Sequence, residues 1–462
     1  MQRGGRRMSA TGGGSLRRTL GFSDLVLLTL GTVIGSGIFL VPGVVLKQTD
    51  GRLGLALLVW IVGGVLSFLG ALTYAELGAS RPDAGGLYTY IRDAFGPLPA
   101  FLYGWASFLV IASGSVATLA VAFSSYLGQL VPLSPAAAKA ISLAMILVIA
   151  AVNIRGTRES ASMENVATAM KVGALLLMSV ALIAVGKGWH NVGPVWPDTW
   201  NGSVFVAAGT AMIGILWAYE GWQYVTFSAG ETRDPQRVFP RAIAVATFAL
   251  VLLYVIANVG YIAALGPAAA ARSDHVAADA MAAILGSASG KLLSALVLVS
   301  IFSATNGLML TAPRLYFAMA RDGVFFKQLA RVSERRGTPV AAIVSLAVWS
   351  AVLALSGTFE QLLTYVVFAG WIFYGLGALA VFPLRKRVAA ADRPYSTPGY
   401  PVTPLLFAAS AALLVLNTLR ERPTQALAGL GVVILGTPAF YLWRARSTAR
   451  PSALAISNQP ED

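Results

Sequence analysis

The sequence predicts an all-α polytopic membrane protein with twelve transmembrane helices, and three observations support this prediction. Hydrophobic residues make up 56% of the 462 residues and charged residues only 12%, with a mean hydropathy of +0.70. Soluble domains carry about 25% charged residues. Apolar segments of about 20 residues, the length needed to cross a bilayer, recur along the chain. Basic residues also gather in every second loop between these segments.

Twelve apolar segments have the length and composition of membrane-spanning helices. An even number of spans places both ends of the chain on the same side of the membrane. The predicted spans cover residues 22–47, 53–79, 97–130, 138–153, 164–186, 203–230, 240–265, 291–320, 340–356, 359–383, 403–419 and 425–443.

The distribution of lysine and arginine predicts on which side of the membrane the two termini lie. Of the 34 basic residues, 24 fall in the two tails and in the loops on their side, and eight fall in the opposite loops. The remaining two, Lys171 and Arg314, fall inside spans. Because cytoplasmic loops carry an excess of Lys and Arg, we expect an integral protein of the cytoplasmic (inner or plasma) membrane with both termini in the cytoplasm. This topology explains the net charge of +14 without a nucleic acid partner.

Several chemistries lack candidate residues in this sequence. The chain has no cysteine, so it can form neither a thiolate metal site nor a disulfide link to a second subunit. Its two histidines, His190 and His275, lie in predicted loops without neighbouring ligands. The charged residues at membrane depth are isolated from one another, which argues against a membrane-embedded enzyme. The sequence also lacks the Gly-rich nucleotide-binding loop that a primary pump would need. We expect no metal, no cofactor and no catalytic residue, and the oligomeric state stays open.

The first predicted span contains three glycines and a serine near its centre: Gly31, Gly35, Ser36 and Gly37. Glycines flanking a serine allow the helix to be interrupted halfway across the membrane. Freed backbone amides are tolerated at that depth only where they face protein or a cavity. Such an interrupted helix is typical of a transporter substrate site. The alternative is that Gly31 and Gly35 form a GxxxG surface for helix packing.

The sixth predicted span is interrupted in a corresponding place, at the segment Trp217-Ala-Tyr-Glu-Gly-Trp222. A carboxylate at membrane depth is costly unless it faces a cavity or a partner. Because the two interrupted spans lie five spans apart, we predict two five-span repeats of inverted orientation, followed by two further helices. The predicted organisation is a cytoplasmic basic tail (1–19), a ten-helix core (20–383, with repeats at about 20–186 and 203–383), two additional helices with the preceding loop (384–446) and a cytoplasmic polar tail (447–462).

Further motifs accompany the two interrupted spans. They are Phe39 with Pro42, Tyr74-Ala-Glu-Leu77, Pro82, Gly85-Gly86 with Tyr88, Gly230-Glu-Thr-x-Asp-Pro235, Thr305-Asn-Gly307 and Arg314. In this combination, from about Leu20 to Pro398, the chain resembles the amino acid–polyamine–organocation superfamily, and most of all its L-amino-acid transporter branch with its bacterial relatives. The resemblance implies a leucine-transporter-like fold and secondary transport of amino acids by alternating access.

The resemblance also implies a substrate site between the two interrupted spans. Backbone amides at the first interruption would donate to the substrate carboxylate, and carbonyls at the second would accept from its ammonium group. In relatives the position of Trp217 carries a gating ring, whereas the alternative is an aromatic side chain packed in the bundle. The expected substrate contacts are Ile34, Gly35, Ser36, Gly37, Trp217, Ala218, Glu220 and Gly221.

Two charged residues inside the spans allow more than one interpretation. Lys171 could extend its ammonium group to the cytoplasmic interface, as such lysines commonly do. The resemblance places it instead where sodium binds in sodium-coupled relatives, so its charge would replace sodium; it could also carry a proton. Glu220 could bind the distal charge of a cationic substrate, take up a proton during transport, or pair with a basic group such as Lys171.

Five other polar residues have local interpretations. Glu76, Glu231 and Arg314 lie near the cytoplasmic ends of spans, where they could form a closing network or lie among the lipid headgroups. Asn306 could hydrogen-bond a neighbouring helix or line the pocket. Asp24, which follows Ser23 at the start of the first span, is predicted to cap that helix.

The sequence thus predicts a sodium-independent secondary transporter of amino acids, working as an exchanger or as a proton-linked carrier, with neutral L-amino acids as the expected substrates. A cationic amino acid or polyamine transporter is the alternative within transport. An amino-acid sensor is a further alternative, although the sequence offers only short segments outside the spans.

Overall fold

A computed structural model describes residues 17–273, 275–286, 289–356 and 359–448. Within these ranges the regular structure is helical, apart from one bridge between Leu20 and Thr232. Ten helices are long and apolar enough to cross a membrane, and one bent pair of helices supplies an eleventh candidate span. The chain is therefore an all-helical polytopic membrane protein.

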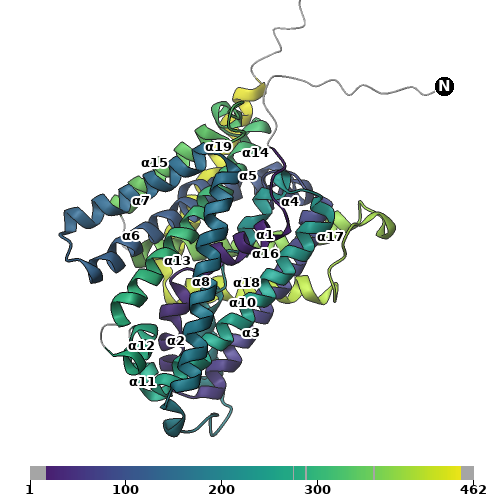
Figure 1. The fold of residues 1–462 in the computed structure, drawn as a ribbon. Helices are drawn as coiled ribbons and strands as arrows, with labels where there is room; N and C mark the ends of the chain where they lie inside the picture. The colour runs from purple at the N-terminus through teal and green to yellow at the C-terminus, as the bar shows by residue number, and fades with distance from the viewer. Residues whose placement is uncertain (1–16, 274, 287–288, 357–358, 449–462) are drawn as a thin grey trace, which may run out of the picture.

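The first half of the described chain runs from α1 to η3 (Figure 1). One long span, made of α5 and α6, contains a π-helical turn, η1. The bounds are α1 Phe22–Val33, α2 Gly37–Gln48, α3 Leu53–Ser80, α4 Leu87–Phe95, α5 Pro97–Ala106, η1 Ser107–Ile111, α6 Ala112–Leu130, α7 Pro135–Arg155, α8 Thr157–Val185, η2 Gly188–Asn191, α9 Gly202–Ala218 and η3 Trp222–Glu231.

The second half runs from α10 to α19, and α13 continues into α14 as one candidate span. The bounds are α10 Pro235–Leu265, α11 Pro267–Arg272, α12 Val276–Leu285, α13 Ser289–Thr311, α14 Pro313–Arg321, η4 Lys327–Ala330, α15 Val340–Ser356, α16 Phe359–Leu379, α17 Val381–Arg385, η5 Ala390–Asp392, α18 Val402–Glu421 and α19 Pro423–Thr448.

The first candidate span is an interrupted helix, which confirms the prediction made from its glycines. α1 ends at Val33, α2 begins at Gly37, and the two helices meet at a bend of 48°. The Gly35 amide donates to the Val33 carbonyl at 2.8 Å, so it leaves the regular ladder in which each amide donates to the carbonyl four residues earlier. Backbone groups at mid-span are thereby turned away from the helix axis.

The second interruption lies between α9 and η3. α9 ends at Ala218, and the 3-10 helix η3 begins at Trp222. Gly221, just before η3, has a φ angle of +130°, a conformation that glycine adopts readily because it has no Cβ atom. Its amide donates to the side-chain oxygen of Gln223 at 3.0 Å, which replaces the helical partner that the interruption removes.

The two interruptions lie directly against each other. A Cβ atom placed on Gly221 would come within 2.6 Å of the Thr32 carbonyl oxygen, and one placed on Gly37 within 3.0 Å of Ala218. The Thr32 hydroxyl donates a 3.1 Å hydrogen bond to the Gly221 carbonyl. Glycine at both positions therefore allows the two backbones to approach at the centre of the molecule.

The candidate spans match eleven of the twelve predicted segments. The remaining predicted segment, 340–356, coincides with α15, an apolar helix of 17 residues. Between α10 and α13, where the sequence analysis placed only a loop, the chain forms the short helices α11 and α12. Apolar stretches of this length do not reveal from sequence whether they form helices.

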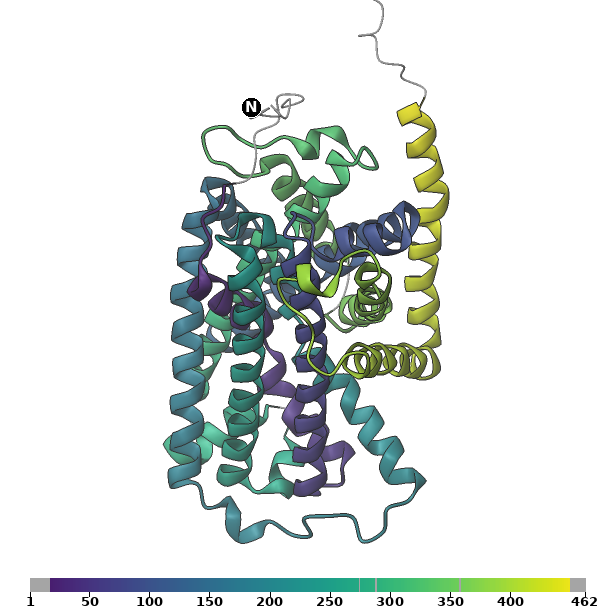
Figure 2. The ribbon, with the colours of Figure 1, turned by 90° about the vertical axis from the view of Figure 1, so that its right-hand side faces the viewer.

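The described chain begins and ends at the same end of the molecule, at the top of Figures 1 and 2. α4 and α14 lie near this end, whereas α2, α11 and α12 lie near the opposite end (Figure 1). The last two helices flank the bundle: α18 lies across it and α19 runs along one edge (Figure 2). Most of the predicted tails, 1–19 and 447–462, lies outside the described residues.

We expect Gly221→Ala to destabilise the protein, because a Cβ atom would meet the Thr32 carbonyl and a positive φ strains residues other than glycine. The free energy of unfolding should fall by about 2 kcal/mol or more. The melting temperature in detergent, followed by tryptophan fluorescence, measures the change. Gly209→Ala in α9 is the control, since nothing lies within 4 Å of its added methyl group. Equal melting temperatures for the two variants would contradict the prediction.

Candidate functional site

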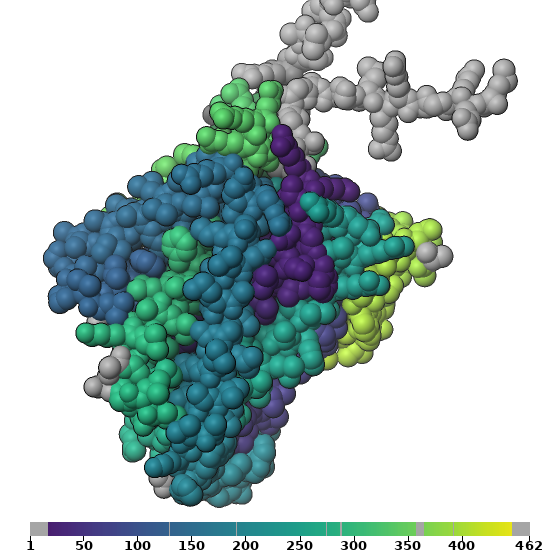
Figure 3. All heavy atoms as spheres, in the orientation of Figure 1, coloured from purple at the N-terminus to yellow at the C-terminus, as the bar shows by residue number. Residues whose placement is uncertain are grey.

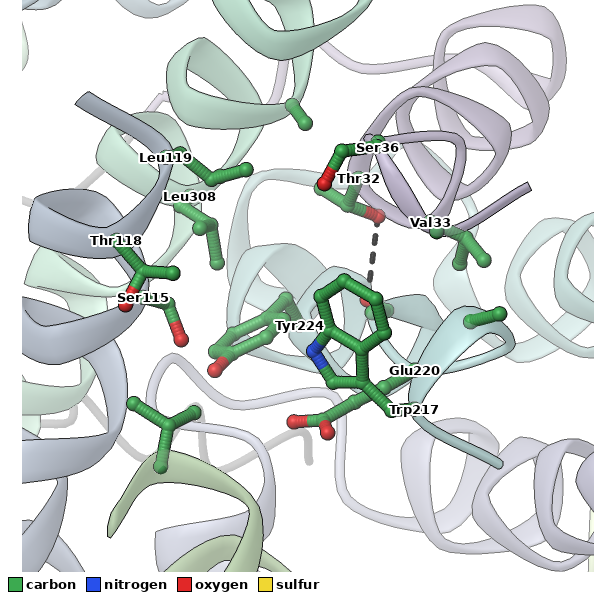
Figure 4. A pocket seen from close by; sticks show the side chains of 16 residues that line it. Thr32, Val33, Ser36, Ser115, Thr118, Leu119, Trp217, Glu220, Tyr224 and Leu308 are labelled. Carbon is green, nitrogen blue, oxygen red and sulfur yellow. Dashed lines mark hydrogen bonds between the residues drawn. The ribbon is translucent and has the colours of Figure 1, made fainter. Parts of the chain in front are cut away.

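A cavity lies where the two interruptions meet, at the centre of the view in Figure 4. It leaves about 80 Å³ open to the centres of water-sized groups. The junctions α1–α2 and α9–η3 form one side, and α6, α13 and α16 complete it. The lining residues are Thr32, Val33, Gly35, Ser36, Gly37, Ser115, Thr118, Leu119, Trp217, Ala218, Glu220, Gly221, Tyr224, Ala304, Leu308 and Val366.

Most of the sequence-predicted contacts lie on this cavity. The seven that line it are Gly35, Ser36, Gly37, Trp217, Ala218, Glu220 and Gly221. Ile34 differs, because it is fully buried behind the lining. Its carbonyl accepts hydrogen bonds from Lys171 Nζ at 2.9 Å and from Ser300 Oγ at 2.7 Å. Ile34 thus ties the interruption to α8 and α13.

Four polar side-chain atoms of the lining have no hydrogen-bond partner within the described part of the chain. They are Ser36 Oγ, Thr118 Oγ1, Glu220 Oε2 and Tyr224 Oη. The Trp371 indole lies beside the Glu220 carboxylate, and the Ser115 and Tyr374 hydroxyls lie beside that of Tyr224, but none of them reaches these two atoms in hydrogen-bonding geometry. Leaving a buried polar group unpaired costs about 1–3 kcal/mol, so groups of this kind are usually satisfied by a ligand or by water. In Figure 4 these side chains come from different helices and border the same space. The cavity is therefore suited to a small polar ligand.

Glu220 reaches the cavity from the interruption of α9. Its Oε1 accepts a hydrogen bond from the Tyr374 hydroxyl at 2.9 Å and another from Gln223 Nε2 at 3.4 Å. The second carboxylate oxygen is one of the four unpaired atoms. Lys171 makes its hydrogen bonds to carbonyls of α1, so the pairing of Glu220 with Lys171 that the sequence left open is not formed in the described structure.

Lys171 is buried on α8, with 1% of its surface exposed. Its ammonium group donates to the Gly31 carbonyl at 2.6 Å and to the Ile34 carbonyl at 2.9 Å. The interpretation in which Lys171 reaches the membrane surface is therefore wrong. The nearby Val33 carbonyl accepts from the Tyr254 hydroxyl at 3.3 Å, so side chains replace the helical partners that the end of α1 lacks.

The charges predicted near span ends are buried and paired at the end of the molecule that carries both termini. Arg314 binds Glu231 at 2.7 Å, and both side chains are 1% exposed. Glu76 pairs instead with Arg385 at 2.6 Å, a partner that the sequence did not indicate. Asp24 accepts from the Gly21 amide as a capping residue and also binds Arg158 at 2.8 Å.

Asn306 does not line the cavity. Its amide group donates to Glu164 at 3.0 Å, and its oxygen accepts from Asn153 at 2.9 Å and from Ser160 at 3.1 Å. Of its two predicted roles, the structure shows the hydrogen bond to neighbouring helices.

Several lining residues were not predicted from the sequence: Thr32 and Val33 lie within the first interrupted motif, and the others lie outside the predicted contacts. Those on α6, which include Ser115 and Thr118, follow a spacing of three residues, and polar residues at helical spacing in an apolar span could have indicated them. Tyr224 projects from a 3-10 helix whose register depends on the interruption. The missed lining residues are Thr32, Val33, Ser115, Thr118, Leu119, Tyr224, Ala304, Leu308 and Val366.

Comparison with known proteins identifies the family. Residues 20–435 match the amino acid permease family. The chain belongs to this family. A relative in Homo sapiens, b(0,+)-type amino acid transporter 1, is 32% identical over 436 residues, which cover 92% of this chain and 88% of the relative. The permease is also 29% identical to the serine/threonine exchanger SteT of Bacillus subtilis, over 94% of this chain and 98% of that protein.

A third relative, large neutral amino acids transporter small subunit 2 of Mus musculus, is 31% identical over 94% of this chain and 82% of its own length. These similarities extend over nearly the whole permease. It is an amino acid transporter rather than an enzyme, and the superfamily resemblance seen in its motifs is confirmed.

The cavity can be tested as the place where the permease holds its substrate. Because the chain has no native cysteine, Thr118→Cys introduces a single thiol into the lining. We expect transported amino acids to slow labelling of this thiol by a small methanethiosulfonate reagent at least tenfold. Ser203→Cys at the exposed start of α9 is the control and should label at the same rate with or without substrate. Unchanged labelling of Thr118→Cys at saturating substrate would contradict the prediction.

Proposed function

We propose that this permease is a sodium-independent secondary transporter of neutral L-amino acids that works by alternating access around the central cavity. It operates as an exchanger or as a proton-linked carrier. The observation that carries the proposal is the cavity itself, which lies where two interrupted helices meet and is lined by four unpaired polar atoms. Permease family membership supplies the substrate class.

Backbone groups of the two interruptions can recognise the α-amino and α-carboxyl groups that all amino acids share. α2 begins at Gly37, so its first amides have no helical acceptor and carry the positive end of the helix dipole toward the cavity. These amides suit a carboxylate. α9 ends at Ala218, where its last carbonyls suit an ammonium group. Trp217 is half-buried beside them and serves in the proposal as the gating ring.

The size of the cavity supports a small substrate. A single water needs about 10–15 Å³ of the space open to its centre, so 80 Å³ accommodates about five to eight such groups. Leu119, Leu308 and Val366 provide apolar contacts beside the polar atoms. A small neutral amino acid with a hydroxyl group fits this mixture, and the name of one relative, serine/threonine exchanger, agrees with it.

Sodium independence is proposed from Lys171. Its buried ammonium group already satisfies the Gly31 and Ile34 carbonyls, which would otherwise be available to a metal cation. If transport follows a proton gradient, the Lys171 ammonium group and the Glu220 carboxylate are the two candidates for carrying the proton.

The finer architecture is proposed on the same basis. Twelve spans, with α15 as the ninth, would form two inverted five-span repeats at about 20–186 and 203–383, and then α18 and α19 in the segment 384–446. Both termini would lie in the cytoplasm. The common end of the described chain and the paired arrangement of α1–α2 and α9–η3 support this layout.

A cationic amino acid is the second candidate substrate, and one observation favours it. Glu220 Oε2 lines the cavity without a hydrogen-bond partner among the described residues. A carboxylate in that position can bind a side-chain ammonium or guanidinium group.

Uptake of labelled amino acids into sodium-free proteoliposomes tests the transport mode. For an exchanger we expect uptake to rise at least tenfold when the vesicles are preloaded with unlabelled neutral amino acids. For a proton-linked carrier, empty vesicles should accumulate label under an inward proton gradient. Vesicles without the permease are the control. Uptake that required sodium in both formats would contradict the role assigned to Lys171.

The substitution Glu220→Gln separates the two substrate classes. If neutral amino acids are the substrates, we expect their apparent affinity to change less than about threefold. If cationic amino acids are carried, their uptake should fall about 10- to 100-fold, because a charge-assisted hydrogen bond contributes about 1.5–3 kcal/mol. Glu159→Gln, which removes an exposed carboxylate of α8, is the matched control and should transport as the native permease does.

A further inference from the structure

The inner face of α8 carries two buried charges of opposite sign. Glu164 and Lys171 are seven residues apart, with Thr168 between them, so all three lie on one side of the helix. Both charged side chains are 1% exposed. The opposite side of α8 forms part of the molecular surface (Figure 3) and carries exposed apolar residues such as Val166 and Leu177. The two charges thus point into the bundle.

Glu164 is surrounded by neutral donors. Its Oε1 accepts from Ser303 at 2.8 Å and from Thr168 at 3.1 Å, and its Oε2 accepts from Asn306 at 3.0 Å. These hydroxyl and amide groups orient the carboxylate, but none of them carries a positive charge. Lys171 has the complementary environment, because its two acceptors are the neutral Gly31 and Ile34 carbonyls.

Gly31 connects the two charged groups. Its carbonyl accepts the Lys171 hydrogen bond, and a Cβ atom placed on Gly31 would lie only 1.9 Å from Glu164 Oε1. The carboxylate therefore packs against the backbone of α1 at the same residue that binds the ammonium group. The described residues in contact with Glu164, which are Ser303 and Asn306 of α13, Thr168 of α8 and Gly31 of α1, are neutral. Lys171, two turns along the same buried face of α8, is the positive charge that acts on this carboxylate.

A buried ionised group without an opposite charge is strongly unfavourable, whereas a compensated pair is tolerated. We propose that Glu164 is a positioning residue, the counter-ion that keeps the Lys171 ammonium group at the carbonyls of the α1 interruption, so that this ammonium group takes the place of a bound monovalent cation. This inference rests on the proposed role of Lys171 and adds the anion that makes that role possible.

Removal of the Lys171 side chain should create a place for a metal cation. Without the lysine side chain, the Gly31 and Ile34 carbonyls lose their cationic partner, and the Glu164 carboxylate packed against Gly31 is left as an uncompensated negative charge. The Ser300 hydroxyl also reaches the Ile34 carbonyl at 2.7 Å. Hard monovalent cations prefer oxygen ligands of this kind. A latent sodium site is therefore expected in a variant that lacks Lys171, and only when Glu164 is present.

The first experiment is a double-substitution cycle on the purified permease in sodium-free detergent. Melting temperatures are compared for the native protein, Glu164→Gln, Lys171→Met and the double variant. Each single substitution leaves one buried charge uncompensated, so we expect the double variant to lose less in melting temperature than either single one. Losses that simply add in the double variant would overturn the inference. Ser303→Ala, which removes one donor but neither charge, is the control and should change the melting temperature least.

The second experiment uses sodium. Replacing choline chloride by sodium chloride at 100 mM should raise the melting temperature of Lys171→Met by several degrees and should not affect the native permease. Glu164→Gln/Lys171→Met should show no sodium effect. A sodium effect of equal size in the double variant, or none in Lys171→Met, would overturn the inference, since Glu164 would then not be the anionic group of the site.

A conservative variant separates charge from shape. Glu164→Asp keeps the negative charge, so it should fold and retain sodium-free exchange even if Glu164→Gln does not fold. Equal loss in Glu164→Asp and Glu164→Gln would show that shape decides and would overturn the inference. Transport by the native permease is measured alongside in both uptake formats. If exchange and proton-linked uptake are both absent, the proposed function fails, while the charge coupling is still read from the melting temperatures.

Discussion

The contact between the two interrupted helices is the constraint on which the rest of the structure depends. Gly221 lies against the Thr32 carbonyl and Gly37 against Ala218, so both backbones reach the centre of the bundle without side chains between them. The hydrogen bond from Thr32 to the Gly221 carbonyl fixes one interruption relative to the other. Because helical pairing ends in both helices where their backbones meet, unpaired backbone groups and a cavity occur together.

The surrounding helices compensate for what the interruption of α1 costs. Its carbonyls are bound by Lys171 of α8, by Ser300 of α13 and by Tyr254 of α10. These three bonds stabilise the broken end while leaving the start of α2 free to face the cavity. The carbonyls at the end of α1 are thus paired within the protein. The amides at the start of α2 are available to an anionic group.

Much of this arrangement could be predicted from the sequence, because glycine beside a polar residue in an apolar run is a local signal. It located both interruptions, and the family resemblance carried by their motifs added seven residues that line the cavity. The remainder depends on packing between distant segments. Tyr374 binds Glu220 across 154 residues, and Arg385 binds Glu76 across 309, and no spacing in the sequence encodes such pairs. Ile34 lies in the same interruption, but it is buried outside the lining, and its carbonyl accepts a hydrogen bond from Lys171.

The buried pair of Glu231 and Arg314 has a mechanical consequence. It joins η3 to α14, and the Thr157 hydroxyl at the start of α8 binds both members, so three segments are held at one point at the end of the molecule near the termini. At the opposite end, Arg52 and Asp198 form an ion pair whose aspartate is 83% exposed. Separating Glu231 from Arg314 would expose two buried charges to water, whereas the carboxylate of Asp198 is already exposed to solvent. The two ends of the molecule are thus held together by ion pairs of different strength. Separating the segments joined by Glu231 and Arg314 costs more free energy than breaking the Arg52–Asp198 pair.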